Sequence, residues 1–169
     1  MTTYDLIVPT WRNTLRALSA MIDKAAAHSK GDALLAERLA QDMFPLATQF
    51  RFVANFPGEG LVRLAKRDFT SHDDDPASLA DAKDRIAETL AMLDTVQPGD
   101  FIAADEEFDM ALPNGMTFRL SADQYARDWA LPNFYFHTST AYAIMRMHGV
   151  AIGKADLLPH MVGYLKPQV

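Results

Sequence analysis

Histidine is the residue type with the widest chemical range in this sequence, because the 169-residue chain contains no cysteine. The absence of thiols excludes disulfides, thiolate nucleophiles and cysteine-based zinc or iron–sulfur sites. The five histidines are His28, His72, His137, His148 and His160. Imidazole binds metals and exchanges protons near neutral pH. These five positions are therefore the first candidates for a functional site.

His137 is the histidine that the sequence pattern places on the inward face of a helix. The inward face of the predicted last helix contains Asn133, His137, Ala141, Ile144, Met145 and His148. His28 falls at a helix end, His72 in a polar loop and His160 in the tail. We interpret His137 as a hydrogen-bonded core residue, with a ligand role as the alternative.

A metal site at His137 would need ligands from other elements. His137 and His148 lie eleven positions apart on one helix, about 16 Å along its axis, whereas a zinc–nitrogen bond is about 2.1 Å long. A His-x-x-x-His pair would use position 133 or 141, which hold Asn133 and Ala141. Asp42, Gln49 and Asp128 are the side chains that could complete such a site. No cofactor is expected, and a divalent zinc, nickel or iron ion is the alternative.

Other catalytic and binding patterns are missing from the sequence. Gly58-Glu59-Gly60 follows a helical stripe and lacks the third glycine of a phosphate loop. No Gly-x-Ser-x-Gly elbow is present. The net charge is −6 and the densest basic cluster, Arg63, Lys66 and Arg67, is followed by Asp68, so a nucleic-acid partner is not expected. No signal peptide or membrane span is recognisable, so we expect a cytoplasmic protein.

Apolar residues spaced three and four apart predict four long helices. The first runs from about Leu6 to His28, and a short helix follows from Ala33 to Leu39. The second long helix begins near Phe44-Pro45 with Asp42 as its cap, and continues through a kink at Pro57. The third begins at Asp75-Pro76 and runs through Leu93, and the last spans Asn133 to Gly149. Residues 1–169 are predicted to form one all-α, up-and-down four-helix bundle.

The apolar period changes from 3.6 to 2 between Phe108 and Leu120, which predicts a β-hairpin before the last helix. A three-residue loop, Pro113-Asn114-Gly115, pairs Leu112 with Met116, Met110 with Phe118, and Phe108 with Leu120. All three pairs are then apolar. Ser121 is predicted to cap a further helical stretch through Trp129, and Gly153 onward is predicted to pack over the bundle as a tail that frays near Pro167.

The C-terminal third carries a resemblance to a known family. The residues are Pro132-Asn133-Phe134-Tyr135-Phe136-His137-Thr138-Ser139-Thr140-Ala141-Tyr142-Ala143-Ile144-Met145-Arg146, then Gly149-Val150 and Gly153-Lys154-Ala155-Asp156, with Tyr4-Asp5-Leu6-Ile7-Val8-Pro9 and Asp42-Met43-Phe44-Pro45-Leu46 earlier. Together they resemble an uncharacterised bacterial domain-of-unknown-function family of the DinB-like helical-bundle superfamily, which also holds metal-dependent thiol transferases. The resemblance implies an up-down-down-up bundle that is commonly dimeric. It also implies three metal-binding histidines, one on the second helix and two on the last, but here the second long helix has none and the last offers only His137 near the expected place.

Three functional hypotheses follow. The first is a small-molecule-binding or regulatory bundle without the three-histidine metal site, its pocket formed near Asn133, Tyr135, His137, Asp42 and Gln49. The second is a divergent metal-dependent hydrolase or thiol transferase that uses His137. The third is a structural homodimer in which the aromatic run Phe134-Tyr135-Phe136 forms the interface.

Overall fold

Four long helices form the body of the protein. The computed structural model describes residues 2–166. The long helices are α1 (Thr3–Ala26), α2 (Leu46–Leu64), α3 (Leu79–Asp94) and α5 (Leu131–Met147). The shorter elements are η1 (Gly31–Ala36), η2 (Pro98–Asp100), β1 (Glu107–Ala111), β2 (Thr117–Ser121), α4 (Ala122–Gln124), η3 (Tyr125–Ala130), α6 (Lys154–Leu157) and η4 (Pro159–Tyr164). The all-α bundle with a small inserted hairpin is confirmed.

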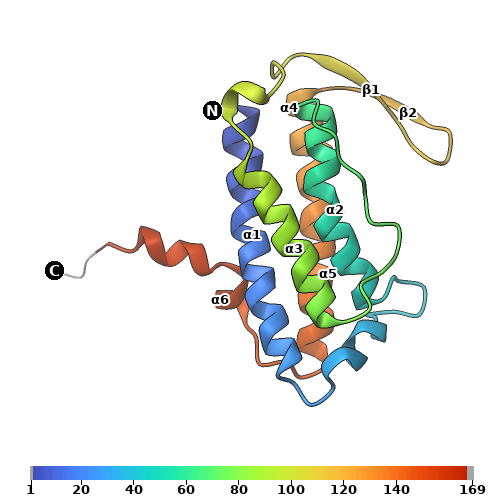
Figure 1. Cartoon of the computed structure of the whole chain (residues 1–169), viewed down its shortest axis with the longest axis vertical. Coiled ribbons are helices and arrows are strands. Elements are labelled where there is room, and N and C mark those ends of the chain that lie inside the picture. The colour runs from blue at the N-terminus through green and yellow to red at the C-terminus, as the bar shows by residue number, and fades with distance from the viewer. Residues whose placement is uncertain (1, 167–169) are drawn as a thin grey trace.

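The helix directions follow the order that the resemblance implies. In Figure 1, α1 and α5 run down the page, whereas α2 and α3 both run up it. Parallel neighbours need a long connection, and residues 65–78 supply it by crossing the full length of the bundle between the top of α2 and the bottom of α3. None of the helices in residues 2–166 is long and apolar enough to cross a membrane.

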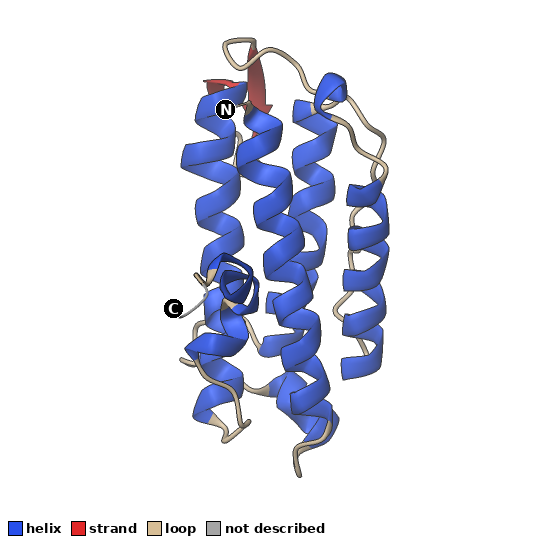
Figure 2. Ribbon diagram, turned by 90° about the vertical axis from the view of Figure 1, so that its left-hand side faces the viewer, coloured by secondary structure: helices blue, strands red, loops and turns tan. Residues whose placement is uncertain are grey.

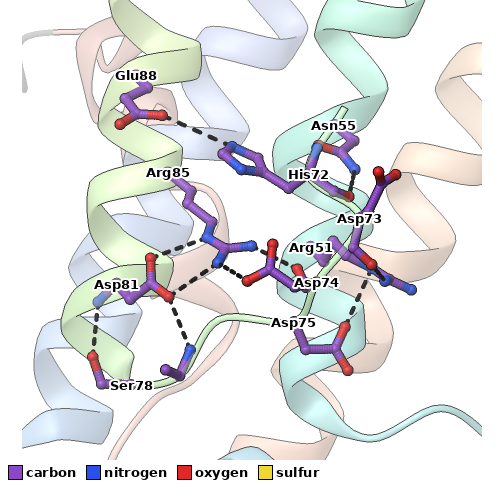
Figure 3. A network of polar contacts seen from close by, with 11 residues as sticks. Arg51, Asn55, His72, Asp73, Asp74, Asp75, Ser78, Asp81, Arg85 and Glu88 are labelled. Carbon is purple, nitrogen blue, oxygen red and sulfur yellow. Dashed lines mark hydrogen bonds and ion pairs between the residues drawn. The ribbon is translucent and has the colours of Figure 1, made fainter. Parts of the chain in front are cut away.

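The connection at residues 65–78, hereafter the strap, is held by polar contacts (Figure 3). Arg85 of α3 reaches Asp74 and Asp81 at 3.0 Å each, and Asn55 of α2 exchanges hydrogen bonds of 2.9 and 3.0 Å with the backbone of His72. Asp75 pairs with Arg51 at 3.2 Å. Asp75 is therefore tied to α2, and the predicted helix start at Asp75-Pro76 is wrong: Ser78 caps α3 by accepting from the Asp81 N–H.

The predicted caps of the other helices agree with the structure only in part. α1 begins three residues before the predicted Leu6, because Thr2 and Asp5 form a capping box. The predicted cap of α2 is wrong, since Pro45 is its N-cap and Asp42 lies exposed in the preceding turn. The short helix predicted at Ala33–Leu39 is a 3₁₀ turn at Gly31–Ala36.

The hairpin has the predicted register. Phe108 pairs with Leu120 and Met110 with Phe118, and the Leu112 N–H donates to the Met116 carbonyl at 2.7 Å. Gly115 has a φ of +86°, the left-handed conformation that closes the three-residue loop. β1 and β2 project from the end of the bundle beside α4 (Figure 1).

The last helix begins earlier than predicted. Ser121 caps α4 as expected, but α4, η3 and α5 then form one continuous helical run from Ala122 to Met147. Pro132 has no N–H to donate and its ring opposes the carbonyl of residue 128 in a regular α-helix. The preceding turn, η3, is widened into a π-helix, with the Leu131 N–H donating to the Ala126 carbonyl. This wider turn accommodates Pro132, so the break predicted before Asn133 is absent.

The core lies along the axis of the bundle and includes Trp11, Leu15, Phe50, Phe134 and Ile144, each at most 1% exposed. α6 packs on α1 through an ion pair of 2.5 Å between Lys24 and Asp156. Leu158 and His160, just after α6, still line cavities against α1 and α5, and the rest of the tail points away from the bundle (Figures 1 and 2). The fraying predicted near Pro167 lies outside the described residues.

Candidate functional site

The packing of α2 against α5 brings two of the predicted site residues together. Gln49 lies in the first turns of α2 and is only 1% exposed, and His137 lies in the middle of α5. His137 Nδ1 and Gln49 Oε1 are 2.8 Å apart. Gln49 was proposed from the sequence as a group that a site at His137 would borrow from another element, and it contacts His137 directly.

The hydrogen bonds of Gln49 determine which nitrogen of His137 carries the proton. Gln49 Nε2 donates to the Phe44 carbonyl at 3.0 Å, so the amide oxygen must be the atom that faces His137. An amide oxygen only accepts, and therefore Nδ1 of His137 is the protonated nitrogen. Nε2 then carries the lone pair, and it makes no hydrogen bond to any residue in the described part of the chain.

Aromatic rings surround the imidazole. The His137 ring lies 4.6 Å from Phe52, 5.4 Å from Phe56 in a stacked arrangement, and 5.1 Å from Phe136 edge-on, measured between ring centroids. Burial among these rings lowers the pKa of His137 from 6.5 to about 4. The imidazole is therefore neutral near pH 7, and Nε2 is a hydrogen-bond acceptor beside apolar surface.

The other predicted pocket residues lie apart from this pair. Asn133, one turn earlier on α5, donates to the Trp129 carbonyl at 2.8 Å. Asp42 is exposed in the turn before α2. Asp128 pairs with Arg127 at 3.4 Å.

Tyr135 borders a separate groove formed by α1, α5 and the start of the tail. Two adjoining cavities, of about 50 and 110 Å³, lie there and share Thr14, Tyr135 and Leu158 in their walls. His160 lines the larger cavity. The pocket predicted from sequence is thus divided between two faces of α5, with Tyr135 on one and His137 on the other.

The remaining histidines have structural partners. His148 Nε2 lies 3.3 Å from Glu37, and its Nδ1 lies 3.2 Å from Lys30. His28 accepts from the Lys30 backbone N–H at 3.3 Å. His72, in the strap, lies 3.8 Å from Glu88.

The side chains around His137 do not fit the three-histidine metal site that the resemblance implies. Gln49 occupies the second-helix position facing His137, and Asn133, one turn before His137, is bonded to its own helix. Within residues 2–166, no group of three or more His, Asp or Glu side chains lies close enough together to hold a metal ion. One imidazole and one amide oxygen fall short of the three or four donors that zinc takes.

Phe52 and Phe56 are the site residues that sequence reasoning missed. They lie three and seven residues after Gln49, so all three side chains share one face of α2. That face lies beside the stripe of core residues, and it turns toward α5 next to His137. Their i, i+3, i+7 spacing from Gln49 is the sequence signal that could have placed Phe52 and Phe56 beside His137.

The crossover strap, the hairpin before the last helix and the α2–α5 pairing define a helical bundle of the DinB type. A solved structure described as a DinB family member protein from Shewanella denitrificans is similar over 98% of this chain and 94% of its own, with 34% identity and a TM-score of 0.82.

The chain belongs to the family described as "Domain of unknown function (DUF1993)", whose model matches residues 3–158. The matched segment includes all four long helices, the hairpin and α6. A search of curated proteins gave no match.

Proposed function

We propose that the face formed by His137, Gln49, Phe52, Phe56 and Phe136 binds a small molecule. The observation that carries the proposal is the bond between His137 Nδ1 and Gln49 Oε1, which leaves the Nε2 lone pair beside three aromatic rings. A hydrogen-bond acceptor held in a fixed orientation on an apolar surface selects for a ligand with one hydrogen-bond donor and an apolar body.

The charge state of His137 narrows the class of ligand. With a pKa of about 4 the imidazole is neutral near pH 7, so it offers no positive charge to a phosphate or a carboxylate. The ring faces of Phe52 and Phe56 favour stacking with a planar ligand. A neutral aromatic or amphipathic molecule with an O–H or N–H group is therefore the class we expect.

Phenol tests this proposal, because it combines an aromatic ring with a single O–H donor. Chemical-shift titration of ¹⁵N-labelled protein should show phenol perturbing the amides of Phe52, Phe56 and His137. Toluene has the same shape without the donor and should bind several-fold more weakly, since a hydrogen bond to a buried acceptor contributes about 1 kcal/mol.

His137→Phe is the matched variant, because it keeps an aromatic ring and removes the acceptor. It should abolish the preference for phenol while retaining weak binding of toluene. Equal binding of phenol and toluene to the unmodified protein, or shifts confined to another face, would exclude the proposal.

Metal analysis separates this proposal from the metal-dependent alternative. Protein purified without a histidine tag, then incubated with zinc, nickel or ferrous ions and desalted, should retain well under one ion per chain. Retention of one ion per chain that disappears in His137→Ala would replace the small-molecule proposal with a metal site.

A further inference from the structure

The groove between α1, α5 and the tail, hereafter the tail groove, has a polar wall, although the helices of a bundle normally meet along apolar stripes. Its two cavities are lined from α1 by Thr10, Asn13 and Thr14, and from α5 by Thr138 and Ser139, together with Tyr135. Residues three and four apart share one face of a helix. Each of the two helices therefore turns a row of hydrogen-bonding side chains toward the same space.

Thr14 is the buried member of this wall that lacks a partner. It lines both cavities and is only 7% exposed, yet its hydroxyl makes no hydrogen bond to any residue between 2 and 166. Thr10 and Thr138 differ, because their hydroxyls donate to the carbonyls of Leu6 and Phe134 at 2.7 and 2.8 Å. Threonine in a helix commonly satisfies its hydroxyl in that way. The hydroxyl of Thr14 is therefore free to bond to a molecule in the groove.

The tail contributes a third side of the tail groove and a second unpartnered group. Leu158 lines both cavities and His160 lines the larger one. Within the described part of the chain, the buried Nδ1 atom of His160 has no hydrogen-bond partner. The ion pair between Lys24 and Asp156 fixes α6, and with it the start of this wall, against α1. Unpaired buried polar groups on two separate elements around one groove indicate that something binds between them.

The composition and the size of the tail groove define the class of ligand. Among the described residues, no Asp, Glu, Lys or Arg lines either cavity, so no fixed charge selects for an anion or a cation. Hydroxyl and amide side chains each donate and accept hydrogen bonds. The cavities, of about 50 and 110 Å³, have room for about five water molecules at about 30 Å³ each. A ligand with several hydroxyl groups can replace such waters and reproduce their hydrogen bonds.

We propose that the tail groove binds a small neutral polyol, a molecule of about three to six carbons with a hydroxyl on most of them. The Thr14 hydroxyl and the Asn13 amide bond to hydroxyls of the ligand, while Tyr135 and Leu158 contact its carbon frame. Tyr135 and His137 lie on different sides of α5, so this site is separate from the aromatic face at His137. It adds a second ligand of a different chemical class.

Chemical-shift titration with myo-inositol tests the polyol site, because this molecule is a neutral ring with a hydroxyl on every carbon. It should perturb the amides of Thr14, Tyr135 and Leu158, with a dissociation constant of about 1 mM, as expected for a ligand of this size. Cyclohexanol has the same ring with a single hydroxyl, and it should bind at least about tenfold more weakly. Equal binding of the two compounds, or no change up to about 50 mM myo-inositol, would overturn the proposal.

Thr14→Val is the central variant, because it removes the unpartnered hydroxyl and keeps the shape of the side chain. It should raise the dissociation constant for myo-inositol at least about fivefold. Thr140→Val makes the same change elsewhere on α5, at a buried residue that lines neither cavity, and should leave the constant unchanged. An unchanged constant in Thr14→Val would exclude the site.

Tyr135→Phe provides a second variant that does not depend on a buried position, since Tyr135 is 47% exposed. It removes only the phenol O–H and should also weaken the binding of myo-inositol severalfold. A sharp thermal transition in each variant will show that loss of binding is not loss of folding.

His137→Phe distinguishes this proposal from the one made for the aromatic face. It should leave the binding of myo-inositol unchanged, whereas Thr14→Val should leave the binding of phenol unchanged. Shifts by myo-inositol that are confined to the amides of Phe52 and Phe56 would overturn the polyol site. Failure of either proposal therefore leaves the other intact.

Discussion

The chemistry of His137 is determined by Gln49, one residue on another helix. Gln49 Nε2 bonds to the Phe44 carbonyl and its oxygen bonds to His137, so the imidazole has a defined tautomer and orientation. Supporting bonds of this kind also orient imidazoles that act as ligands or bases in other proteins. The geometry here leaves a neutral acceptor, and two predictions follow at this scale.

The first concerns stability in mild acid. The pKa of His137 is lowered to about 4 in the folded protein, whereas in the unfolded chain it is about 6.5. Between these values the unfolded state binds one more proton than the folded state. The contribution of His137 to the free energy of unfolding is therefore fully present above pH 6.5, and it falls as the pH drops toward 4. Because the side chain is partly exposed, we expect a loss of about 1–2 kcal/mol.

Urea unfolding at pH 7.0 and pH 4.5 measures this loss. His137→Phe has no group to titrate at this position, and its stability should therefore change less than that of the unmodified protein over the same interval. If the two proteins lose the same stability, His137 is not held neutral by its surroundings.

The second concerns the Gln49–His137 bond. Gln49→Leu should cost about 1–3 kcal/mol, since it leaves His137 Nδ1 and the Phe44 carbonyl without partners. His137→Phe leaves Gln49 Oε1 unpaired and should cost a similar amount. The double variant should cost less than the sum of the two, because it leaves neither His137 Nδ1 nor Gln49 Oε1 unpaired, and only the Phe44 carbonyl lacks its partner. Additive losses would mean that the bond contributes nothing in solution.

At the residue scale, the sequence predicted His137 as the inward polar group and named Gln49 among its potential partners. It did not predict that Tyr135 and His137 would face different sides of α5. Residues two apart on a helix are separated by about 200° around its axis, so they share a pocket only if neighbouring elements close around both. That closure depends on the tail and on α2, whose positions no local pattern specifies.

At the scale of elements, the strap is the connection that permits α2 and α3 to run in parallel. Arg85 links it to α3 through Asp74 and Asp81, and its side chain is only 10% exposed. The hydrogen bonds from Arg85 lower the pKa of both aspartates below the usual value. These contacts are therefore present above about pH 4 and are lost as the carboxylates protonate in stronger acid.

Arg85→Met should release the strap. We expect a loss of about 1–3 kcal/mol in stability, the range for hydrogen bonds to charged groups, and faster hydrogen exchange in residues 71–76 than in the helices. Arg16→Met, on the exposed face of α1, is the control and should leave both unchanged. If the strap in Arg85→Met is as well protected from hydrogen exchange as in the unmodified protein, Arg51 and Asn55 hold it without Arg85.

The contact between α1 and α2 depends on Gly60. A Cβ atom at this position would lie 2.6 Å from the Trp11 ring, which is fully buried. Gly60→Ala should therefore lower stability by about 1–3 kcal/mol through overpacking, despite the better helix propensity of alanine. Gly99→Ala has open space around its Cβ and should change stability by less than about 0.5 kcal/mol. Thermal unfolding of both variants makes the comparison.

The elements differ in how well local sequence predicts them. The hairpin register followed from Pro113-Asn114-Gly115 and three apolar pairs, because turn chemistry and alternation act over a few residues. The run through Pro132 was predicted as two helices, since proline ordinarily ends one. The π-turn at Tyr125–Ala130 that carries the chain past Pro132 depends on packing against the rest of the bundle, and that information is not local.

At the scale of the whole molecule, the exposed charges and the exposed apolar groups lie on different faces. The exposed carboxylates of α1 and α3 repel a second copy of the chain, whereas α5 and the segment after α6 present exposed apolar side chains, namely Tyr135, Phe136, Met147, Met161, Val162, Tyr164 and Leu165. Repulsion between acidic faces limits the strength of the homodimer predicted from the sequence and also directs which faces meet.

Salt and protein concentration should therefore both affect unfolding. If folding is coupled to dimerisation, Tm rises with protein concentration, because only folded chains associate with each other. Raising the salt from 50 to 500 mM screens the repulsion between chains of net charge −6 and should tighten the dimer. Met147→Lys places a charge on the exposed apolar side of α5 and should show a Tm independent of concentration, as expected for a monomer. Ala91→Lys places the same charge on the exposed face of α3 and should follow the unmodified protein. Scanning calorimetry at 5 and 200 µM distinguishes these cases, and a Tm of the unmodified protein that does not change with concentration would contradict the predicted homodimer.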